Sequence, residues 1–186
     1  MGRIGSESSR MATLVEDLLT LARLDEGRPL EITDIDLVKL ADNAVFDLQA
    51  LDPTRTVGLT GITGRTPPMS LIVPGDRDRL SQVFTNLIGN IVRYTPSGSP
   101  VEIALGLSGD TAIVELRDHG PGIDETDRSR VFERFYRADT SRNRKSGGSG
   151  LGLAIVSGIL AAHRGRASLT KTKGGGLTVR IELPTA

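Results

Sequence analysis

The pattern of residues 100–117 limits the possible folds of this 186-residue chain more than any other feature. Apolar and polar residues alternate over 100–107 and over 111–117, and Ser108-Gly109-Asp110 separates the two runs, which is typical of a β-hairpin. A second hairpin is predicted at 166–172 and 177–183, with its turn at Gly174-Gly175-Gly176. Because hairpin strands are antiparallel, the predicted sheet is mixed rather than purely parallel.

Apolar periodicity predicts helices between these strands. The order is helix, helix, two strands, helix, two strands, a polar loop, helix and two strands. With helices on one face of the sheet, this order predicts a two-layer α/β sandwich. The predicted helices are 6–26, 37–51 after an N-cap at Asp36, 77–94 and 151–163, the further strands are near 56–61 and 70–74, and the loop is 119–149.

The first predicted helix has an apolar seam that is typical of a helical bundle. Met11, Leu14, Leu18 and Leu21 recur at intervals of three and four residues, and Gly27-Arg28-Pro29 ends the helix. We find no obvious partner for this seam elsewhere in the chain, so we expect residues 1–28 to be the C-terminal part of a bundle whose remainder lies outside the sequence. Residues 29–186 are expected to form the α/β domain.

Composition excludes several classes of function. The 23 basic and 23 acidic residues cancel, so no net field attracts nucleic acid or an anionic membrane. The absence of cysteine excludes disulfides and a thiol nucleophile, and two histidines are too few for a histidine-rich metal site. Apolar runs are far shorter than the roughly 20 residues of a membrane span, and the chain shows no signal peptide.

Three segments carry candidate chemistry. Asn86, Asn90 and Arg93 share one face of a predicted helix, where carboxamide oxygens can bind a hard cation, although a solvated outer face is the simpler interpretation. The glycines of 148–152 lead into a helix, where backbone N–H groups and the helix dipole could bind a polyphosphate. Alternatively, these glycines form a surface loop. Asp118, before two glycines, can accept from an amino group or cap a turn.

Together these segments resemble the catalytic and ATP-binding domain of bacterial sensor histidine kinases. The resemblance runs from about residue 6 to residue 184, with its motifs in family order and spacing. Residues 14–25 resemble the end of the second dimerisation helix. The motifs are an N box at 86–96, a first glycine box at 118–123, an F box at 131–137, a second glycine box at 148–156 and a third at 174–178.

The resemblance implies the Bergerat ATP-binding fold and, as cofactors, ATP and Mg²⁺. Asn90 would be the metal ligand, Asn86 and Arg137 would be catalytic, and Asp118 would accept from the adenine amine. The ATP lid would be 124–149, anchored by Phe132 and Phe135. The nucleotide-binding residues would be Asn90, Arg93, Tyr94, Asp118, Gly120, Gly122, Ile123, Gly148, Ser149, Gly150, Leu151, Gly152, Leu153 and Thr178.

The chain departs from the family pattern chiefly at the phosphoacceptor, and other features separate it from rival families. The phosphoacceptor histidine is missing, since His119 lies in the adenine box and His163 at a helix end, so the chain resembles a catalytic fragment. A Bergerat-fold ATPase switch is the alternative. Such ATPases typically carry a glutamate where this chain has Asn86, which cannot accept a proton from water. An anti-sigma-factor-like serine kinase, a second alternative, lacks the leading helix.

The resemblance also implies partners and a location. The catalysed reaction would transfer the ATP γ-phosphate to a histidine on the protein's own dimerisation domain, for relay to an aspartate on a response regulator. The parent kinase would be a homodimer in the cell membrane, with this part in the cytoplasm. No nucleic-acid partner is expected.

Overall fold

The computed structural model describes residues 2–137 and 148–185, with the backbone alone described for residues 2–10. In the described part, five strands form the main sheet in the order β2-β4-β5-β7-β6. The pair β2–β4 is parallel and the other three pairs are antiparallel. These strands are β2 (Val57–Gly61), β4 (Val101–Ser108), β5 (Thr111–Asp118), β6 (Arg166–Lys171) and β7 (Leu177–Pro184).

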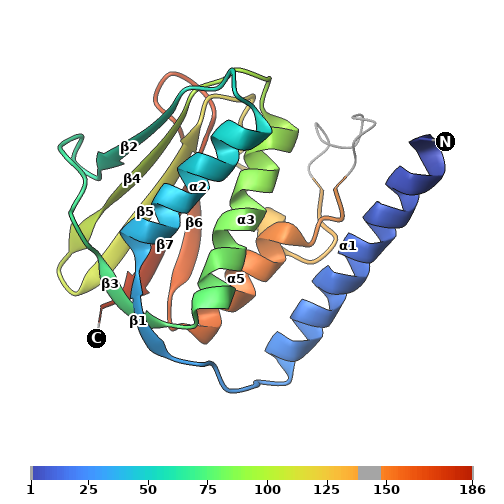
Figure 1. Ribbon diagram of the computed structural model, residues 1–186, viewed down its shortest axis with the longest axis horizontal. Helices are drawn as coiled ribbons and strands as arrows, with labels where there is room; N and C mark the ends of the chain where they lie inside the picture. Colours follow the sequence, from blue (N-terminus) through green and yellow to red (C-terminus); the bar gives the residue numbers. More distant parts are fainter. Residues whose placement is uncertain (1, 138–147, 186) are drawn as a thin grey trace.

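Three helices lie against one face of this sheet, as expected from the predicted order of helices and strands (Figure 1). They are α2 (Leu37–Leu51), α3 (Arg77–Tyr94) and α5 (Gly152–Ala162). The mixed sheet and the two-layer α/β sandwich are therefore confirmed. The described part of the polar loop between β5 and α5 contains a short 3₁₀ helix, η1 (Arg130–Phe132).

A two-stranded sheet outside the main sheet is missing from the sequence-based prediction. It pairs β1 (Thr33–Asp36) with β3 (Ile72–Gly75) in antiparallel register, so the strand predicted at 70–74 does not join the main sheet. The segment Thr33-Asp34-Ile35-Asp36 has a single apolar residue and thus too little alternation to indicate a strand. Asp36 then caps α2 as predicted, because its carboxylate accepts from the Val38 N–H.

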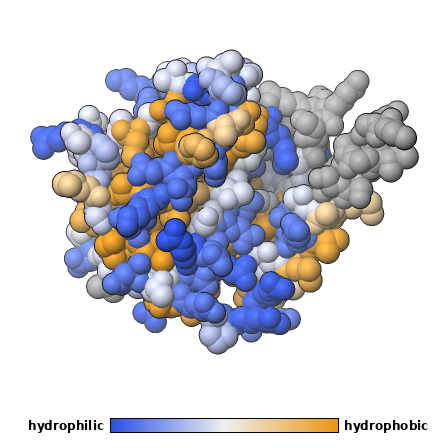
Figure 2. Space-filling view, in the orientation of Figure 1, coloured by the Kyte–Doolittle hydropathy of each residue, from blue (hydrophilic) through white to orange (hydrophobic). Residues whose placement is uncertain are grey.

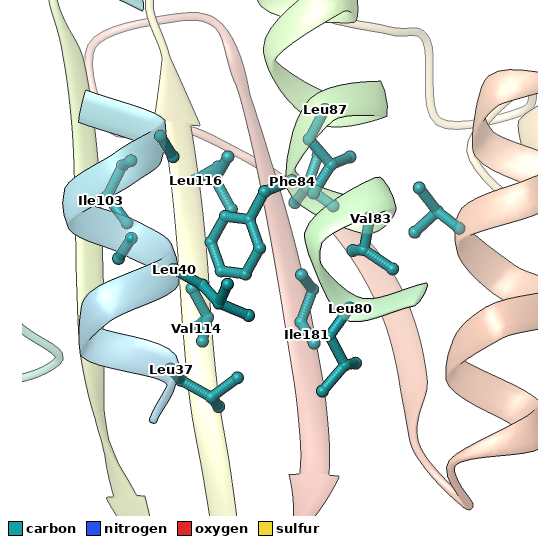
Figure 3. Close-up of a cluster of buried hydrophobic side chains, with 14 of the residues drawn as sticks. Leu37, Leu40, Leu80, Val83, Phe84, Leu87, Ile103, Val114, Leu116 and Ile181 are labelled. Carbon is teal, nitrogen blue, oxygen red and sulfur yellow. The ribbon is translucent and has the colours of Figure 1, made fainter. Parts of the chain in front are cut away.

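The core fills the space between the helices and the sheet. Phe84 of α3 is 5% exposed and points between α2 and the strands, where Leu40, Val114 and Leu116 surround it in Figure 3. Ala112, Val114 and Leu116 of β5 are apolar and buried on this side, which leaves Glu115 and Arg117 for the open face of the sheet. Burial of one such aromatic ring typically contributes about 1.5–3 kcal/mol to the free energy of unfolding.

Helix α1 (Gly2–Asp25) runs beside α5, away from the sheet (Figure 1). Leu21 is 4% exposed, and Leu24 lies so close to α5 that a Cβ at Gly158 would meet its Cδ1 at 3.1 Å. Leu14 is half-buried and also packs against the core. The expectation that the seam has no partner within the chain is therefore wrong for these three leucines, because helical spacing does not tell which surface a stripe will cover. Met11, Val15 and Leu18 of the seam are exposed, as is Leu19 beside them.

Apolar side chains also reach the surface over the helical layer. Figure 2 shows several apolar patches separated by hydrophilic side chains on this side of the molecule. The exposed residues include Phe46 and Leu51, both on α2. Among the described residues, none of the helices is long and apolar enough to cross a membrane.

Asp52, just after α2, ties this helix to the loop that follows α3. Its carboxylate accepts from the Thr54 hydroxyl at 2.5 Å, the Gly98 N–H at 3.0 Å and the Ser97 hydroxyl at 2.9 Å. These hydrogen bonds, that from Thr54 first, hold the pKa of Asp52 far below its ordinary value of 3.8. The ionised carboxylate therefore favours the folded state above pH 3.8, and this contribution disappears as the pH falls below that value.

We expect the variant Asp52→Asn to flatten the acid dependence of stability. Urea unfolding at pH 7 and at about pH 2.5 should show a smaller difference in the free energy of unfolding for the variant than for the wild type. Asp47→Asn, which removes an exposed carboxylate on α2, is the matched control. An equal difference in Asp52→Asn and the wild type would show that these hydrogen bonds do not favour the ionised carboxylate.

Candidate functional site

Asp118 ends β5 as a buried carboxylate, 8% exposed, at the edge of the helical layer. Its Oδ1 accepts from the Gly120 N–H at 2.8 Å and from the Leu177 N–H at 3.2 Å. The capped turn that the sequence left as an alternative is therefore present. Both hydrogen bonds use Oδ1, so neither occupies Oδ2, and a turn role does not exclude an acceptor role.

The third glycine cluster lies directly against this turn. A Cβ at Gly176 would come within 1.9 Å of the Asp118 carbonyl oxygen and 2.7 Å of His119 Cα, and Gly176 has a φ of +105°. Glycine alone fits such a close approach with a positive φ. Gly122 belongs to the same packing, because a Cβ there would lie 3.1 Å from the Gly176 carbonyl oxygen.

At the other side, the N-terminus of α5 lies over the polar face of α3. A Cβ at Gly152 would lie 3.7 Å from Asn86 Oδ1 and 3.9 Å from Asn90 Oδ1. Gly148 comes closer still, since a Cβ there would meet Arg93 Nη1 at 2.5 Å and Tyr94 Oη at 3.1 Å. The structure thus brings the N box and the second glycine box together.

The α5 N-terminus has the polarity of an anion site. The first N–H groups of a helix have no acceptor within it, and the helix dipole adds positive charge there. The residue before the helix, Leu151, is fully buried and has no side chain that could cap it, while the Ser149 hydroxyl accepts from the Leu151 N–H at 3.2 Å. Gly150, with a φ of +72°, turns the chain into this position, and partly buried Leu153 packs against the core.

The potential metal ligands near Asn90 suit Mg²⁺ better than a metal ion that takes all of its ligands from the protein. The described residues contain no group of three histidine, cysteine, aspartate or glutamate side chains that could hold a metal ion. The carboxamide oxygens of Asn86 and Asn90 are hard ligands, and buried Asn86 Nδ2 has no hydrogen-bond partner among the described residues. Mg²⁺ typically uses few protein ligands and completes its shell with phosphates and water.

The F box packs differently from the prediction. Phe132 is half-buried, but Phe135 is 60% exposed, so the expectation that both rings anchor the lid is wrong for Phe135. The reason is local backbone geometry, since Phe135 has a φ of +62° and donates its N–H to the Gly150 carbonyl. Buried Val131 anchors the segment instead. Half-buried Arg137 is the last residue before a gap in the described chain. Residues 138–147 of the predicted lid lie outside the described residues.

Thr178 lies on the other face of the sheet from Asp118. It pairs with Arg117, and paired residues on antiparallel strands share a face, whereas consecutive residues such as Arg117 and Asp118 alternate. Its hydroxyl is 2.9 Å from the Thr172 hydroxyl, and it lines a hollow with His119. The structure therefore does not bring Thr178 together with the other predicted residues. Ile123, half-buried, follows the first glycine box directly.

Helix α1 contributes two contacts that sequence reasoning missed. The Ser149 hydroxyl donates to Asp17 at 3.1 Å, and Arg134 of the F box donates to Asp25 at 2.6 Å. Burial raises the pKa of Asp17, although the hydrogen bond from Ser149 opposes that effect. Both contacts join residues more than a hundred positions apart, so no local pattern could indicate them.

Comparison with known proteins agrees with this geometry. Residues 75–186 match the family described as histidine kinase-, DNA gyrase B-, and HSP90-like ATPase. The probable sensor histidine kinase TcrY of Mycobacterium tuberculosis is 44% identical over 94% of this chain and 36% of its own length. The signal transduction histidine-protein kinase BaeS of Escherichia coli is 39% identical over 96% of this chain and 38% of its own length.

The fold agrees as well. A crystal structure of full-length ShkA in complex with AMPPNP superimposes with a TM-score of 0.80 at 26% identity, over 97% of this chain and 37% of that one. The chain therefore belongs to the histidine kinase-, DNA gyrase B- and HSP90-like ATPases. Within that family it is similar to the ATP-binding part of sensor histidine kinases, and it spans well under half the length of TcrY and BaeS.

We expect Gly176→Ala to destabilise the fold far more than Gly174→Ala. Both glycines have a positive φ, which costs an alanine about 1–2 kcal/mol, but only Gly176 would also drive a Cβ into the Asp118 backbone. A Cβ at Gly174 meets nothing within 4 Å. Chemical denaturation should show a loss of about 3 kcal/mol or more for Gly176→Ala. Equal losses in the two variants would contradict the packing described for the third glycine cluster.

Proposed function

We propose that this chain is the catalytic ATP-binding domain of a two-component sensor histidine kinase. The observation that carries the proposal is the pairing of two features on one side of the sheet. A buried carboxylate, Asp118, stands at the end of β5, and an uncapped helix N-terminus lies over Asn86 and Asn90. Such a pair suits a ligand with a base that donates at one end and a polyphosphate at the other.

Asp118 would recognise adenine. Its Oδ2 can accept from the exocyclic amine while Oδ1 keeps the turn in place, and Gly120, Gly122 and Ile123 would form the wall around the base. Tyr94, beside Gly148, would pack against the ring. A guanine carbonyl facing a buried carboxylate would leave the charge unpaired, typically a cost of about 1–3 kcal/mol or more.

The second glycine box would hold the phosphates. The backbone N–H groups of 148–152 and the α5 dipole offer hydrogen bonds and positive charge without side-chain bulk. Arg93 would add a positive charge beside Gly148, and Arg137 would reach the γ-phosphate from the F box. Asn90 would bind Mg²⁺, which when bound neutralises phosphate charge. The contribution of the protein is then mostly positioning and charge stabilisation.

Asn86 favours phosphoryl transfer to a protein over hydrolysis. A carboxamide cannot accept a proton from water, so at this position it cannot serve as the general base of an ATPase switch.

Neither histidine of the chain is exposed in the site. His163 is 6% exposed, accepts from the Asp76 N–H and lies 2.8 Å from the Ile159 carbonyl oxygen, while His119 faces Glu102 in the hollow on the opposite side of the sheet.

The acceptor would therefore be a histidine on the dimerisation domain of the parent kinase, followed by transfer to a response regulator. Helix α1 would be the end of that domain, because its exposed apolar stripe suits a helical bundle and its other side contacts α5. We further propose that the parent is a membrane-bound homodimer with this part in the cytoplasm.

The alternative function is that of a serine kinase of the anti-sigma-factor type.

We expect the chain to bind a non-hydrolysable ATP analogue more tightly with Mg²⁺ than without it. Asn90→Ala should remove most of the gain from Mg²⁺, because the protein ligand is lost. GTP should bind at least about tenfold more weakly than ATP. Calorimetry measures both, and Asn43→Ala, on the exposed side of α2, is the control. Equal affinities for ATP and GTP, or an undiminished Mg²⁺ effect in Asn90→Ala, would overturn the assignment.

We expect the chain alone not to label itself with radioactive γ-phosphate, and to label a separately supplied dimerisation domain that carries the phosphoacceptor histidine. Transfer should be slow, because the effective concentration given by covalent linkage is lost. An acid-labile, base-stable phosphate on the added domain is the expected product. The same product on the chain alone would identify His119 or His163 as an acceptor and contradict this account.

A further inference from the structure

Arg55 is a buried arginine between α2 and β2, with a side chain that is 1% exposed. A buried guanidinium is costly unless its charge and its donors are paired. Asp52 supplies the charge, with its Oδ2 at 3.3 Å from Arg55 Nη2. We call these two residues the Asp52–Arg55 clamp.

The clamp holds the loop formed by residues 95–99, which follows α3. Arg55 Nη1 donates to Thr95 Oγ1 and to the Ser99 carbonyl, both at 2.9 Å. Arg55 Nη2 donates to the Pro96 carbonyl at 3.1 Å, and Asp52 accepts from the remaining two residues of the loop. The two terminal nitrogens of the planar guanidinium thus donate three hydrogen bonds to the loop. A lysine ammonium has a single nitrogen and cannot reproduce this planar arrangement of donors.

Thr95 passes this fixation on to the candidate site. Its hydroxyl donates to the Ile91 carbonyl at 2.7 Å, which closes the last turn of α3 next to Tyr94. Its methyl group lies against Gly120, since a Cβ there would meet Thr95 Cγ2 at 2.8 Å. The Gly120 N–H in turn donates to the Asp118 carboxylate. One unbroken series of contacts therefore runs from Arg55 to the carboxylate.

We propose that Arg55 is a positioning residue for the base end of the nucleotide site, an inference that rests on the proposed function. The clamp sets Thr95, and Thr95 sets both the turn that carries Asp118 and the end of α3 that carries Tyr94. The phosphate end is built separately from Asn86, Asn90 and the α5 N-terminus. Loss of the clamp should therefore weaken recognition of the base and leave the contribution of Mg²⁺ and the phosphates intact.

The test compares two affinities in the same folded protein. Adenosine, which has no phosphates, reports on the base end. The ratio of the Kd values of an ATP analogue without and with Mg²⁺ reports on the phosphate end. In Arg55→Lys, which keeps the charge but loses the fork, adenosine affinity should fall about tenfold and the Mg²⁺ ratio should equal that of the wild type. Arg166→Lys, at an exposed ion pair on β6, is the matched control.

A second pair of variants covers the case in which Arg55→Lys does not fold. Thr95→Val keeps the methyl contact with Gly120 and removes the hydroxyl that Arg55 binds, so adenosine affinity should again fall. Thr95→Ser keeps the hydroxyl but loses the methyl group that lies against Gly120, so adenosine affinity should fall in this variant as well, through loss of the other link in the series. Circular dichroism at the assay temperature verifies that each variant is folded, because a change in stability alone would leave the affinity of the folded protein unchanged.

The outcomes separate this inference from the function on which it rests. If the wild type binds neither adenosine nor the ATP analogue, the proposed function is wrong. If folded Arg55→Lys or Thr95→Val binds adenosine as the wild type does, the clamp has no positioning role, although the proposed function stands. If the Mg²⁺ ratio falls together with adenosine affinity, the clamp acts on the whole domain and the inference is wrong.

Discussion

The approach of the Gly176 backbone to the Asp118 carbonyl is the contact on which the candidate site depends. It lets the turn between β6 and β7 lie against the end of β5, where the Leu177 N–H reaches the Asp118 carboxylate. The Gly120 N–H donates to the same carboxylate oxygen, Oδ1. The two hydrogen bonds hold the buried carboxylate at the edge of the core, and neither of them uses Oδ2. A side chain at position 176 would separate the two strands' ends and move the carboxylate.

The opposite end of the site depends on how α5 meets α3. The uncapped N-terminus of α5 is directed over Asn86 and Asn90, because Leu151 before it is fully buried and the glycines on either side allow close approach. Helix α1 contacts the same segment through Asp17 and Ser149. The proposed phosphate end of the site is therefore physically linked to the helix that we propose to be part of the dimerisation bundle. The proposed base end is linked to the end of α2 through Asp52 and Arg55.

Much of this architecture could be predicted from local sequence. Strand alternation and helical periodicity predict the hairpins and the main helices, since a half-buried element repeats its own pattern along the chain. Asp118, Asn90 and the glycine boxes are likewise recognisable from residue type and spacing. The strand β1 was not predictable, because one apolar residue in four carries no period. Nor were the roles of Arg55 and Asp17, because their partners are distant in sequence. Thr178 was included by its place in a motif, whereas strand register decides its face.

The central claim is that one site binds the base at Asp118 and the phosphates at the α5 N-terminus. The most direct measurement is a crystal structure of the chain with a non-hydrolysable ATP analogue and Mg²⁺. This account predicts the exocyclic amine of adenine within hydrogen-bonding distance of Asp118 Oδ2, and phosphate oxygens on the backbone N–H groups of 148–152. A nucleotide bound in the hollow beside His119 and Thr178, or an adenine amine that does not meet Asp118, would contradict it.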